Sequence, residues 1–494
     1  MKKHILGLSM GVAACAIAGA AFAAEGTNNS YTDQSGTNGK ITVNQNSNGA
    51  STRVVTGGNG GGDNYVGYNG NPFRQSGTDN ELVVNQTGTS NRLGFNAGSQ
   101  SGNNNTANVL QQGNQSTVDL QQAGNNGGRV STAKTFTDAY GNTLASNQIT
   151  QDENALRSSI DLRQTGGSNG QFNLKQSGTE NSQTVRQSGD GNQVATAQDS
   201  STNNSSISIT QVGLSASKPN YAYADQGGQS QSFISASQTG DTNSAYFSQQ
   251  SLGGKKYNNG IVATQNGYVN YVVAAQYDGS NNRIYTTQNG NNGIGSIFQY
   301  LGDGNTASIE QTVGSDSAYA SLQQKGSGNY ATSTQSGNRN KLHGPGSGFG
   351  YAYSDSAYQN GNDNQLFNTQ SNRDNTAYIL QQGNSNYISN SQTGVNSTAD
   401  IQQKGNSNQV FSNQDAGSDT AMLLVRQNGN NNYVNSFQTG YGNTADLTQN
   451  GSLNQIYGSQ SGMNNTATVT QTNNSNVTSY SQSGKNNTVT VSQK

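Results

Sequence analysis

One stretch shows the pattern that much of the chain repeats: Gln460-Ser461-Gly462-Met463-Asn464-Asn465-Thr466-Ala467-Thr468-Val469-Thr470-Gln471. It begins and ends with glutamine, and its second half alternates in polarity. In an extended strand, Asn465, Ala467, Val469 and Gln471 fall on one face, and the intervening threonines fall on the other. The pattern therefore predicts a half-buried β-strand that follows a short polar link.

The same unit recurs at intervals of 11 residues over the C-terminal part of the chain. Neighbouring units alternate between a small residue, such as Ala467, and a larger one, such as Ile456, so the full repeat spans about 22 residues. The repeated positions are the glutamines Gln427, Gln438, Gln449, Gln460, Gln471, Gln482 and Gln493, the asparagines Asn443, Asn454, Asn465, Asn476 and Asn487, the glycines Gly440, Gly451, Gly462 and Gly484, and the apolar residues Ala445, Leu447, Ile456, Ala467, Val469, Val489 and Val491.

This repeat predicts an all-β fold: a β-solenoid in which parallel strands stack in register, two strands to a turn, in an amyloid-like arrangement. We expect the repeated glutamines and asparagines to face inward. Each side-chain amide would then bond to the identical amide one turn above and below, at the strand spacing of ~4.8 Å. The apolar positions would form a thin core, and the glycines would supply the positive φ that a tight arc needs.

The composition excludes several other classes of protein. Only 29% of the 494 residues are hydrophobic, against about 45–50% apolar residues in a typical globular domain. The formal net charge is −2, so there is no basic footprint for nucleic acid. No segment after the first 25 residues is apolar enough to span a membrane.

The N-terminal residues have the pattern of a secretory signal peptide: a basic start, an apolar stretch, and small residues before the cleavage site. We predict cleavage between Ala23 and Ala24, which also removes Cys15, the single cysteine. The predicted division of the chain is a signal peptide at 1–23, a short N-terminal segment at 24–33, and the repeat solenoid at 34–494, with insertions at about 46–74, 123–150 and 343–358.

Residues suited to catalysis are scarce. The one histidine after the signal peptide is His343, and we interpret it as a structural residue in an insertion. The glycine-rich residues 57–63 only faintly match a calcium-binding repeat. We therefore predict no enzyme, no metal and no cofactor. The outward tyrosines have two interpretations: an adhesive surface, or good strand formers on an exposed face.

The stretch Gln460–Gln471 resembles the curlin repeat of bacterial curli subunits, whose pattern Q-x-G-x-x-N-x-A-x-x-x-Q it matches at every fixed position. The resemblance covers most of residues 34–493, although Asn454 and Asn476 stand where the family has a leading serine. It implies a secreted functional-amyloid subunit. Such a subunit passes through an outer-membrane export pore, assembles with a companion curli-type subunit, and forms pilus-like fibres on the cell surface for adhesion and biofilm matrix.

Two interpretations beyond a bulk fibre subunit remain open at this stage. The chain could nucleate fibres rather than build them, or it could be a monomeric secreted solenoid that binds a surface polysaccharide or ice. The repeat continues in phase to Gln493, and no capping helix or charged segment follows it. Open strand edges template pairing with another chain, so we expect head-to-tail self-assembly through the terminal turns.

Overall fold

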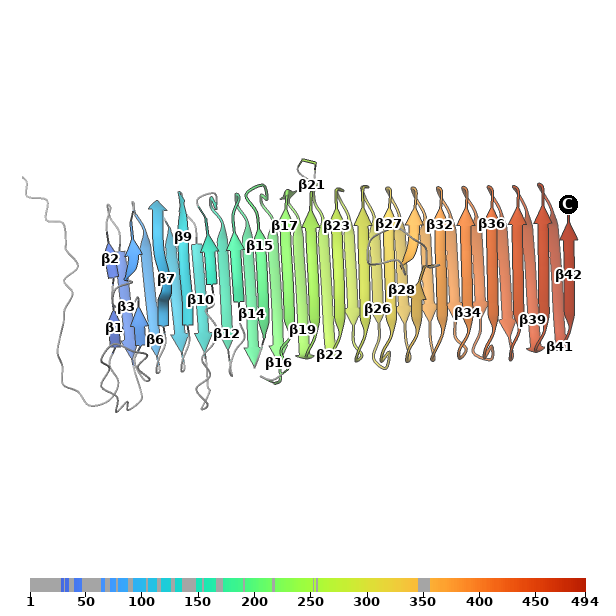
Figure 1. Cartoon of the computed structure of the whole chain (residues 1–494), viewed down its shortest axis with the longest axis horizontal. Helices are drawn as coiled ribbons and strands as arrows, with labels where there is room; N and C mark the ends of the chain where they lie inside the picture. The colour runs from blue at the N-terminus through green and yellow to red at the C-terminus, as the bar shows by residue number, and fades with distance from the viewer. Residues whose placement is uncertain are drawn as a thin grey trace, which may run out of the picture.

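The structure, a computed structural model, describes residues 28–30, 32–34, 40–46, 64–66, 72–76, 79–87, 92–103, 105–112, 117–125, 129–135, 148–152, 155–165, 172–189, 192–215, 218–251, 253–254, 256–344 and 356–494. These residues form strands and short connections, without a helix. The strands lie side by side across the long axis of the molecule, with β1 near one end and β42 at the other (Figure 1). The predicted all-β solenoid is confirmed.

The strands belong to two long sheets that face each other. Sheet 1 is 22-stranded. Its strands are β1 (Asn28–Ser30), β2 (Thr32–Gln34), β4 (Asn64–Val66), β5 (Phe73–Gln75), β7 (Arg92–Asn103), β9 (Thr117–Asn125), β11 (Gln148–Gln151), β13 (Phe172–Gln176), β15 (Gln193–Gln198), β17 (Tyr221–Gly227), β20 (Ser244–Gln250), β23 (Tyr271–Tyr277), β25 (Ile294–Tyr300), β27 (Tyr319–Lys325), β29 (Lys341–His343), β30 (Ala357–Asn360), β32 (Thr376–Gln382), β34 (Thr398–Lys404), β36 (Met422–Asn428), β38 (Thr444–Asn450), β40 (Thr466–Thr472) and β42 (Thr488–Gln493).

Sheet 2 takes the alternate strands of the chain. They are β3 (Lys40–Asn46), β6 (Glu81–Thr87), β8 (Thr106–Gln112), β10 (Arg129–Thr135), β12 (Ser159–Thr165), β14 (Ser182–Gly189), β16 (Ser206–Gly213), β19 (Phe233–Asp241), β22 (Gly260–Tyr268), β24 (Arg283–Gln288), β26 (Thr306–Gln311), β28 (Tyr330–Gln335), β31 (Gln365–Gln370), β33 (Tyr387–Gln392), β35 (Gln409–Gln414), β37 (Tyr433–Thr439), β39 (Gln455–Met463) and β41 (Val477–Lys485). A separate two-stranded pair, β18 (Gln229–Ser230) and β21 (Lys256–Tyr257), lies outside both sheets.

Pairing within each sheet is parallel and in register. Strand β40 pairs with β38 on one side and β42 on the other, so that Gln471 lies opposite Gln449 and Gln493. Equivalent residues are therefore stacked one turn apart, as the 22-residue repeat predicts. The chain passes from sheet 1 to sheet 2 and back within each turn.

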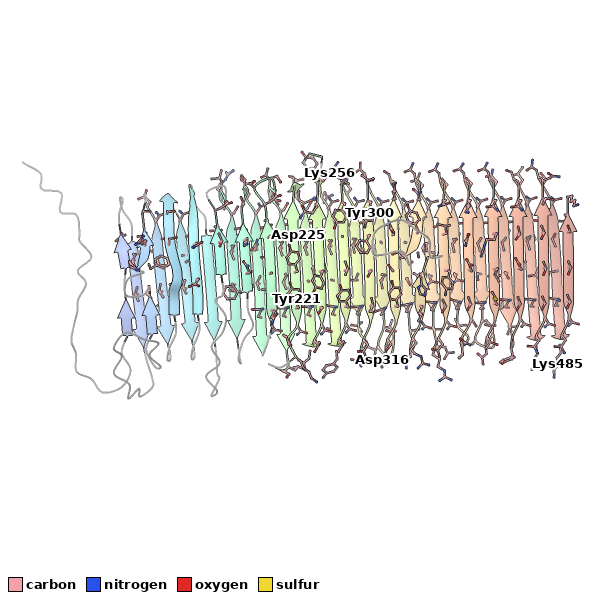
Figure 2. All side chains as sticks on the ribbon, viewed as in Figure 1. Tyr221, Asp225, Lys256, Tyr300, Asp316 and Lys485 are labelled. Atoms are coloured by element: carbon pink, nitrogen blue, oxygen red, sulfur yellow. The ribbon has the colours of Figure 1, made fainter. Side chains whose placement is uncertain are left out.

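The core is a thin layer between the two sheets. Along β40 the side chains alternate between half-exposed and buried, and Ala467 and Val469 are fully buried. One continuous apolar cluster runs from Val66 to Tyr480. Figure 2 shows side chains repeating from strand to strand along the stack. A strand that buries alternate residues against an opposite sheet is held by that pattern, because a one-residue slip would turn its apolar side chains to solvent.

The predicted boundary at residue 34 is wrong for the described residues before it. Residues Asn28–Ser30 form β1 and pair with Asn64–Val66 of β4. Pairing therefore begins before Gln34. The same contact corrects the predicted insertion at 46–74, because β4 and the start of β5 lie within it. Residues 47–63 lie outside the described residues, and so does the glycine-rich segment 57–63.

The predicted insertion at 123–150 is also wrong in its described parts. Residues Arg129–Thr135 form β10, which pairs with β8 on one side and β12 on the other. Lys134 occupies the register position that Gln111 and Gln164 hold in the neighbouring strands. A search for glutamines at a fixed spacing passes over this strand, although the backbone pairing continues through it.

The third predicted insertion, at 343–358, interrupts a single strand of sheet 1. Strands β29 and β30 both lie between β27 and β32, so together they hold one place in the stack. His343 is the last residue of β29 rather than a loop residue, and its ring lies between Tyr319 and Tyr378, with centroids 5.4 and 5.1 Å away. Residues 345–355, the signal peptide 1–23 and the cleavage residues Ala23 and Ala24 lie outside the described residues.

Candidate assembly site

Two rows of glutamine side chains run through the core along the stack. In sheet 1, the Nε2 of Gln427 donates to Oε1 of Gln449 at 2.9 Å, and Gln449 donates to Gln471 at 3.0 Å. In sheet 2, Gln438 donates to Gln460, and Gln460 donates to Gln482, both at 2.8 Å. These glutamine side chains are buried, in agreement with the prediction that they face inward. An amide in such a row has its donor and acceptor met by its own repeat, which removes the cost of burying it.

Each of these glutamines also joins the two sheets. Nε2 of Gln460 in sheet 2 makes a second hydrogen bond, 2.8 Å to the carbonyl oxygen of Thr444 in sheet 1. Nε2 of Gln471 in sheet 1 donates to the carbonyl oxygen of Gln455 in sheet 2 at 3.0 Å. The second N–H of the amide thus bonds across the core, and this fixes which atom of the side chain faces the next turn.

The Gln–Gln bonds share one direction. From Gln34, which donates to Gln75 at 2.6 Å, to Gln471, which donates to Gln493 at 2.8 Å, Nε2 points to the turn nearer the C-terminus. The C-terminal end of a row therefore presents a donor group, and the N-terminal end presents an acceptor. The stack has a polarity that a head-to-tail contact satisfies and a head-to-head contact does not.

The expectation that each asparagine bonds to an identical amide is confirmed in part, because Nδ2 of Asn465 donates to Oδ1 of Asn443 at 3.1 Å and Nδ2 of Asn487 donates to Oδ1 of Asn465 at 3.0 Å. The backbone N–H of Asn465 donates to Oδ1 of Asn443 at 3.0 Å, and Nδ2 of Asn465 donates to the carbonyl oxygen of Gly484 at 3.1 Å. Asn454 repeats this with Oδ1 of Asn432 and the carbonyl of Asn473. The asparagine side chain therefore bonds to backbone groups of neighbouring turns as well as to the equivalent amide.

The remaining repeated asparagines follow the same rule. Nδ2 of Asn443 donates to Thr439 O, that of Asn476 to Thr472 O, and that of Asn487 to Ser483 O. Asn473 has a positive φ of 73°, in an arc that carries no glycine. Asparagine thus satisfies arc groups that no strand ladder reaches.

The arc glycines have the backbone conformation that the sequence predicts. Gly440, Gly451, Gly462 and Gly484 have φ of 93°, 122°, 108° and 107°. A Cβ built on Gly462 would lie 1.9 Å from the carbonyl oxygen of Gly484 in the next turn. Glycine is therefore required at Gly462 by close stacking as well as by φ. At Gly484 the nearest atom to such a Cβ is 3.5 Å away.

The predicted apolar residues line the interior in columns. Ala445, Leu447, Ile456, Ala467 and Val469 are fully buried. The last members of the columns, Val489 and Val491, are only partly buried against the same cluster. The difference has a simple cause, since β42 has a neighbouring strand on one side only.

The C-terminal edge of the stack is formed by β41 and β42. Thr466 N–H donates to Asn487 O. In a parallel ladder this places the N–H and C=O groups of Val489 and Val491 toward β40, and those of Thr488, Thr490 and Ser492 away from it. Strand β42 therefore presents an open row of backbone donors and acceptors. The edge continues the register of the turns beneath it.

One buried aromatic ring lies close to this edge. Tyr480 of β41 is 7% exposed and lies beside Gly458, where a Cβ would be 2.3 Å from the tyrosine hydroxyl oxygen. The corresponding positions in preceding strands are occupied by Ser436 and Ser412. Burial raises the pKa of Tyr480. The absence of a side chain at Gly458 makes room for the ring inside the core.

Charged groups of sheet 1 lie on its outer side. Nη2 of Arg426 is 2.5 Å from Oδ2 of Asp400 on the adjacent strand. Asp225, labelled in Figure 2, accepts a hydrogen bond from Nε2 of Gln250, and burial raises the pKa of its carboxyl group. Among the described residues no group of three His, Cys, Asp or Glu side chains is placed to hold a metal ion.

Sequence reasoning did not find the arrangement of aromatic rings on the outer face of sheet 2. Six rings follow one another along the stack: Tyr330, Phe367, Tyr387, Phe411, Tyr433 and Tyr457. Their successive centroids are 5.2–5.7 Å apart. The residues are spread over more than a hundred positions, so only the strand register reveals the row. We call these six residues the aromatic ridge.

Comparison with known families identifies one segment of the chain. The family model described as "Curlin associated repeat" matches residues 440–472, which run from the end of β37 through β40. This confirms the resemblance to the curlin repeat for that segment, which contains Gln449, Gln460 and Gln471. No curated protein matches the chain. The described part of the chain holds no helix with the length and apolarity that crossing a membrane requires.

Proposed function

We propose that this chain is a self-assembling structural subunit of curli-like extracellular amyloid fibres, with a role in cell adhesion and biofilm matrix. The observation that carries the proposal is the open edge at β41 and β42. There Gln493, Val489 and Val491 continue the amide row and the apolar columns into β42, whose described pairing is with β40. A strand edge of this kind is a template for pairing with a further chain.

Growth joins the edge formed by β41 and β42 to the first strands, β1 to β3, of a second copy. The polarity of the glutamine rows supports this direction, since Gln493 ends its row with a donor and Gln34 begins one with an acceptor. The contact uses two different surfaces of the same chain and does not close on itself. Such heterologous contacts produce filaments.

The extracellular setting is part of the proposal. It is supported by the signal-peptide pattern at 1–23 and by the family match at 440–472. An outer-membrane export pore and a companion curli-type subunit belong to the same proposal. We propose a structural rather than an enzymatic role, because the described interior is occupied by repeating amide and aliphatic side chains.

Proline substitution at the edge tests the proposal. Changing Thr488→Pro and Thr490→Pro removes two N–H groups that point away from β40, so the fold beneath should remain intact. The matched control, Thr488→Ala with Thr490→Ala, removes the same side chains and keeps both donors. Elongation of preformed fibres is followed by sedimentation and electron microscopy.

We expect fibres of the double alanine variant to elongate like those of the wild-type protein. Fibres of the double proline variant should elongate poorly at this edge. Equal elongation of both variants would exclude growth through β42. A wild-type chain that stays monomeric at high concentration would remove the assembly proposal altogether.

A further inference from the structure

The aromatic ridge on sheet 2 has a regular chemical alternation. Register pairs Tyr330 with Gln365, Gln365 with Tyr387, Tyr387 with Gln409, Gln409 with Tyr433, and Tyr433 with Gln455. A ring and an amide thus alternate from turn to turn in this column. In the column beside it, Phe367, Phe411 and Tyr457 alternate with Ser389 and Asn435. The two columns together form a checkerboard of aromatic and hydrogen-bonding side chains.

The strands that carry the ridge are uncharged. Strands β28, β31, β33, β35, β37 and β39, all fully described, contain no Asp, Glu, Lys, Arg or His. The opposite sheet differs over the same turns, with Asp400 and Lys404 in β34, Arg426 in β36 and Asp446 in β38. A face without charge does not select an ionic polymer, and it costs little to cover with a neutral one.

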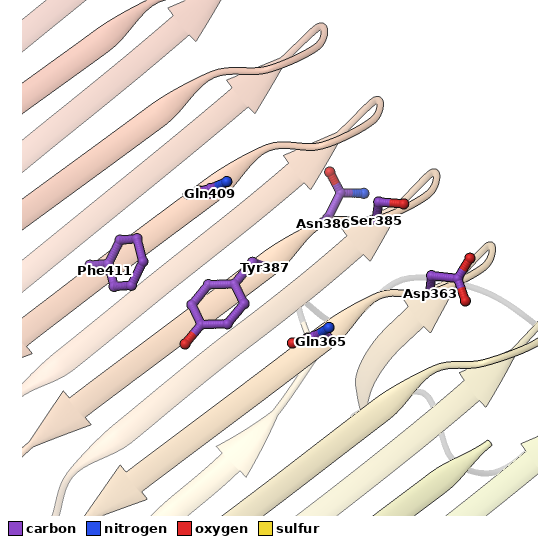
Figure 3. Close-up of a pocket in the computed structure, with 7 residues that line it drawn as sticks. All are labelled: Asp363, Gln365, Ser385, Asn386, Tyr387, Gln409 and Phe411. Carbon is purple, nitrogen blue, oxygen red and sulfur yellow. The ribbon is translucent and has the colours of Figure 1, made fainter. Parts of the chain in front are cut away.

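The rings are accessible to a ligand. Tyr330 is 39% exposed and Tyr457 is 41% exposed, and the four rings between them are half-buried. Between them, Tyr387 and Phe411 border a hollow of about 390 Å³ whose walls include Gln365 and Gln409 (Figure 3). Asp363, in an arc, lies at its end. The hollow therefore combines an aromatic surface with amide groups that both donate and accept hydrogen bonds.

We propose that the aromatic ridge binds a neutral, extended, β-linked polysaccharide laid along the long axis of the stack. Sugar rings have apolar faces that stack on aromatic rings and hydroxyl groups at their edges that bond to amides. Successive sugars of such a chain alternate in orientation, so their pattern repeats every two units. The ridge repeats every two turns in each column, which is about 10 Å at the strand spacing of a sheet.

The occupant follows from these two properties together. The uncharged face favours a neutral partner, and the two-turn alternation favours a linear, periodic one. The proposal deepens the adhesive part of the proposed function by naming the ligand class. The ridge lies within one chain, so polysaccharide binding does not require fibre assembly. The binding proposal and the assembly proposal can therefore be refuted independently.

The test compares two triple variants with the full chain. The ridge variant is Tyr387→Thr, Phe411→Thr and Tyr433→Thr, because threonine keeps the strand preference while removing the rings. The matched control is Tyr221→Thr, Tyr246→Thr and Tyr271→Thr on sheet 1, where three rings form a similar row with centroids 5.3 and 5.6 Å apart. The probe is soluble cellohexaose, measured by calorimetry at low and high salt, with alginate as the charged comparator. Circular dichroism checks the fold of each variant.

We expect the wild-type chain to bind cellohexaose with little dependence on salt. The ridge variant should bind about tenfold or more weakly, and the control variant should bind like the wild type. Absence of wild-type binding, equal weakening in both variants, or binding of alginate alone with steep salt dependence would each overturn the proposal. Loss of lateral fibre bundling in the ridge variant without any glucan binding would make a second copy the occupant, and would also overturn it.

Fibre formation is scored in the same samples by sedimentation. Intact fibres without glucan binding would reject the ridge proposal alone. Glucan binding by a chain that stays monomeric would reject the assembly proposal alone.

Discussion

Replacing Gln460 by leucine tests whether the glutamine rows stabilise the solenoid. The side chain is fully buried, and its two N–H groups are shared among three acceptors: Gln482 Oε1 at 2.8 Å, Thr444 O at 2.8 Å and Asn465 O at 3.1 Å. It also accepts from Nε2 of Gln438 at 2.8 Å. Leucine has a similar size and keeps none of these bonds.

The cost follows from the groups that lose their partner. Gln438 Nε2 loses Gln460 Oε1 as an acceptor but still donates to Met422 O and Asn443 O, so this loss costs little free energy. Gln482 Oε1 loses its donor inside the core, at about 1–3 kcal/mol for a buried unpaired group, whereas Thr444 O and Asn465 O keep their ladder bonds and each lose about 0.5–1.5 kcal/mol. Part of this is offset because leucine is more apolar, leaving a net loss of about 2–3 kcal/mol.

The matched control is Gln455→Leu on the same strand, because the side chain of Gln455 is exposed. Hydrogen exchange by mass spectrometry measures local opening of β37 to β41. We expect exchange there to rise about 30- to 150-fold in Gln460→Leu, which is the opening equilibrium that a loss of 2–3 kcal/mol produces. Gln455→Leu should leave it nearly unchanged.

Two results would contradict the reasoning. If Gln460→Leu exchanges like the wild-type protein, apolar packing alone holds the turn together. If both variants open equally, the effect belongs to leucine on this strand and not to the buried amide.

Three further predictions concern single positions. Gly462→Ala should lose about 2 kcal/mol or more, since its φ is 108° and its Cβ would meet Gly484 O. Gly253→Ala, with open space around it, should be neutral in thermal melts. Burial raises the pKa of Asp225, so its ionised form opposes folding at neutral pH, and the free energy of unfolding should rise as pH falls through that pKa. Asp225→Asn should therefore raise the thermal unfolding midpoint at pH 7 and abolish this pH dependence. The control Asp446→Asn should do neither. Tyr480→Ser should leave a cavity and cost about 3–5 kcal/mol of unfolding free energy. The double variant Gly458→Ser with Tyr480→Ser has serine at both positions, as the preceding strands have at Ser412 and Ser436, and should recover part of that loss. If the effects of the two substitutions simply add, the two sites do not interact.

The sequence predicts the main architecture because the same residue type, and not only the same spacing, recurs in each unit. Gln449, Gln460 and Gln471 mark both the end of each strand and its inward face, so spacing and facing come from one residue type. The thin core follows in the same way from the alternation around Ala467 and Val469. These features depend only on nearest neighbours along the chain and one turn away.

The errors arise where strand pairing continues although the repeated glutamine is missing. Strand β10 keeps its ladder with Lys134 at the glutamine register, and β4 keeps its ladder without the usual unit. Backbone hydrogen bonds do not require a particular side chain, so a missing glutamine does not end a sheet. The bonds from the asparagines to arc carbonyls were also missed, because they depend on the φ values of those arcs. The aromatic ridge needed the register between turns.

The one-way order of the glutamine bonds gives the stack a physical direction. Each side-chain amide carries a dipole, and a row in which every Nε2 faces the next turn aligns these dipoles head to tail, as peptide units align in a helix. Hydrogen bonds in such rows polarise one another in a medium of low dielectric constant. The two ends therefore differ electrically: the end near Gln493 is partly positive and the end near Gln34 is partly negative. An incoming chain meets a different potential at each end, so the two ends of a filament should add chains at different rates.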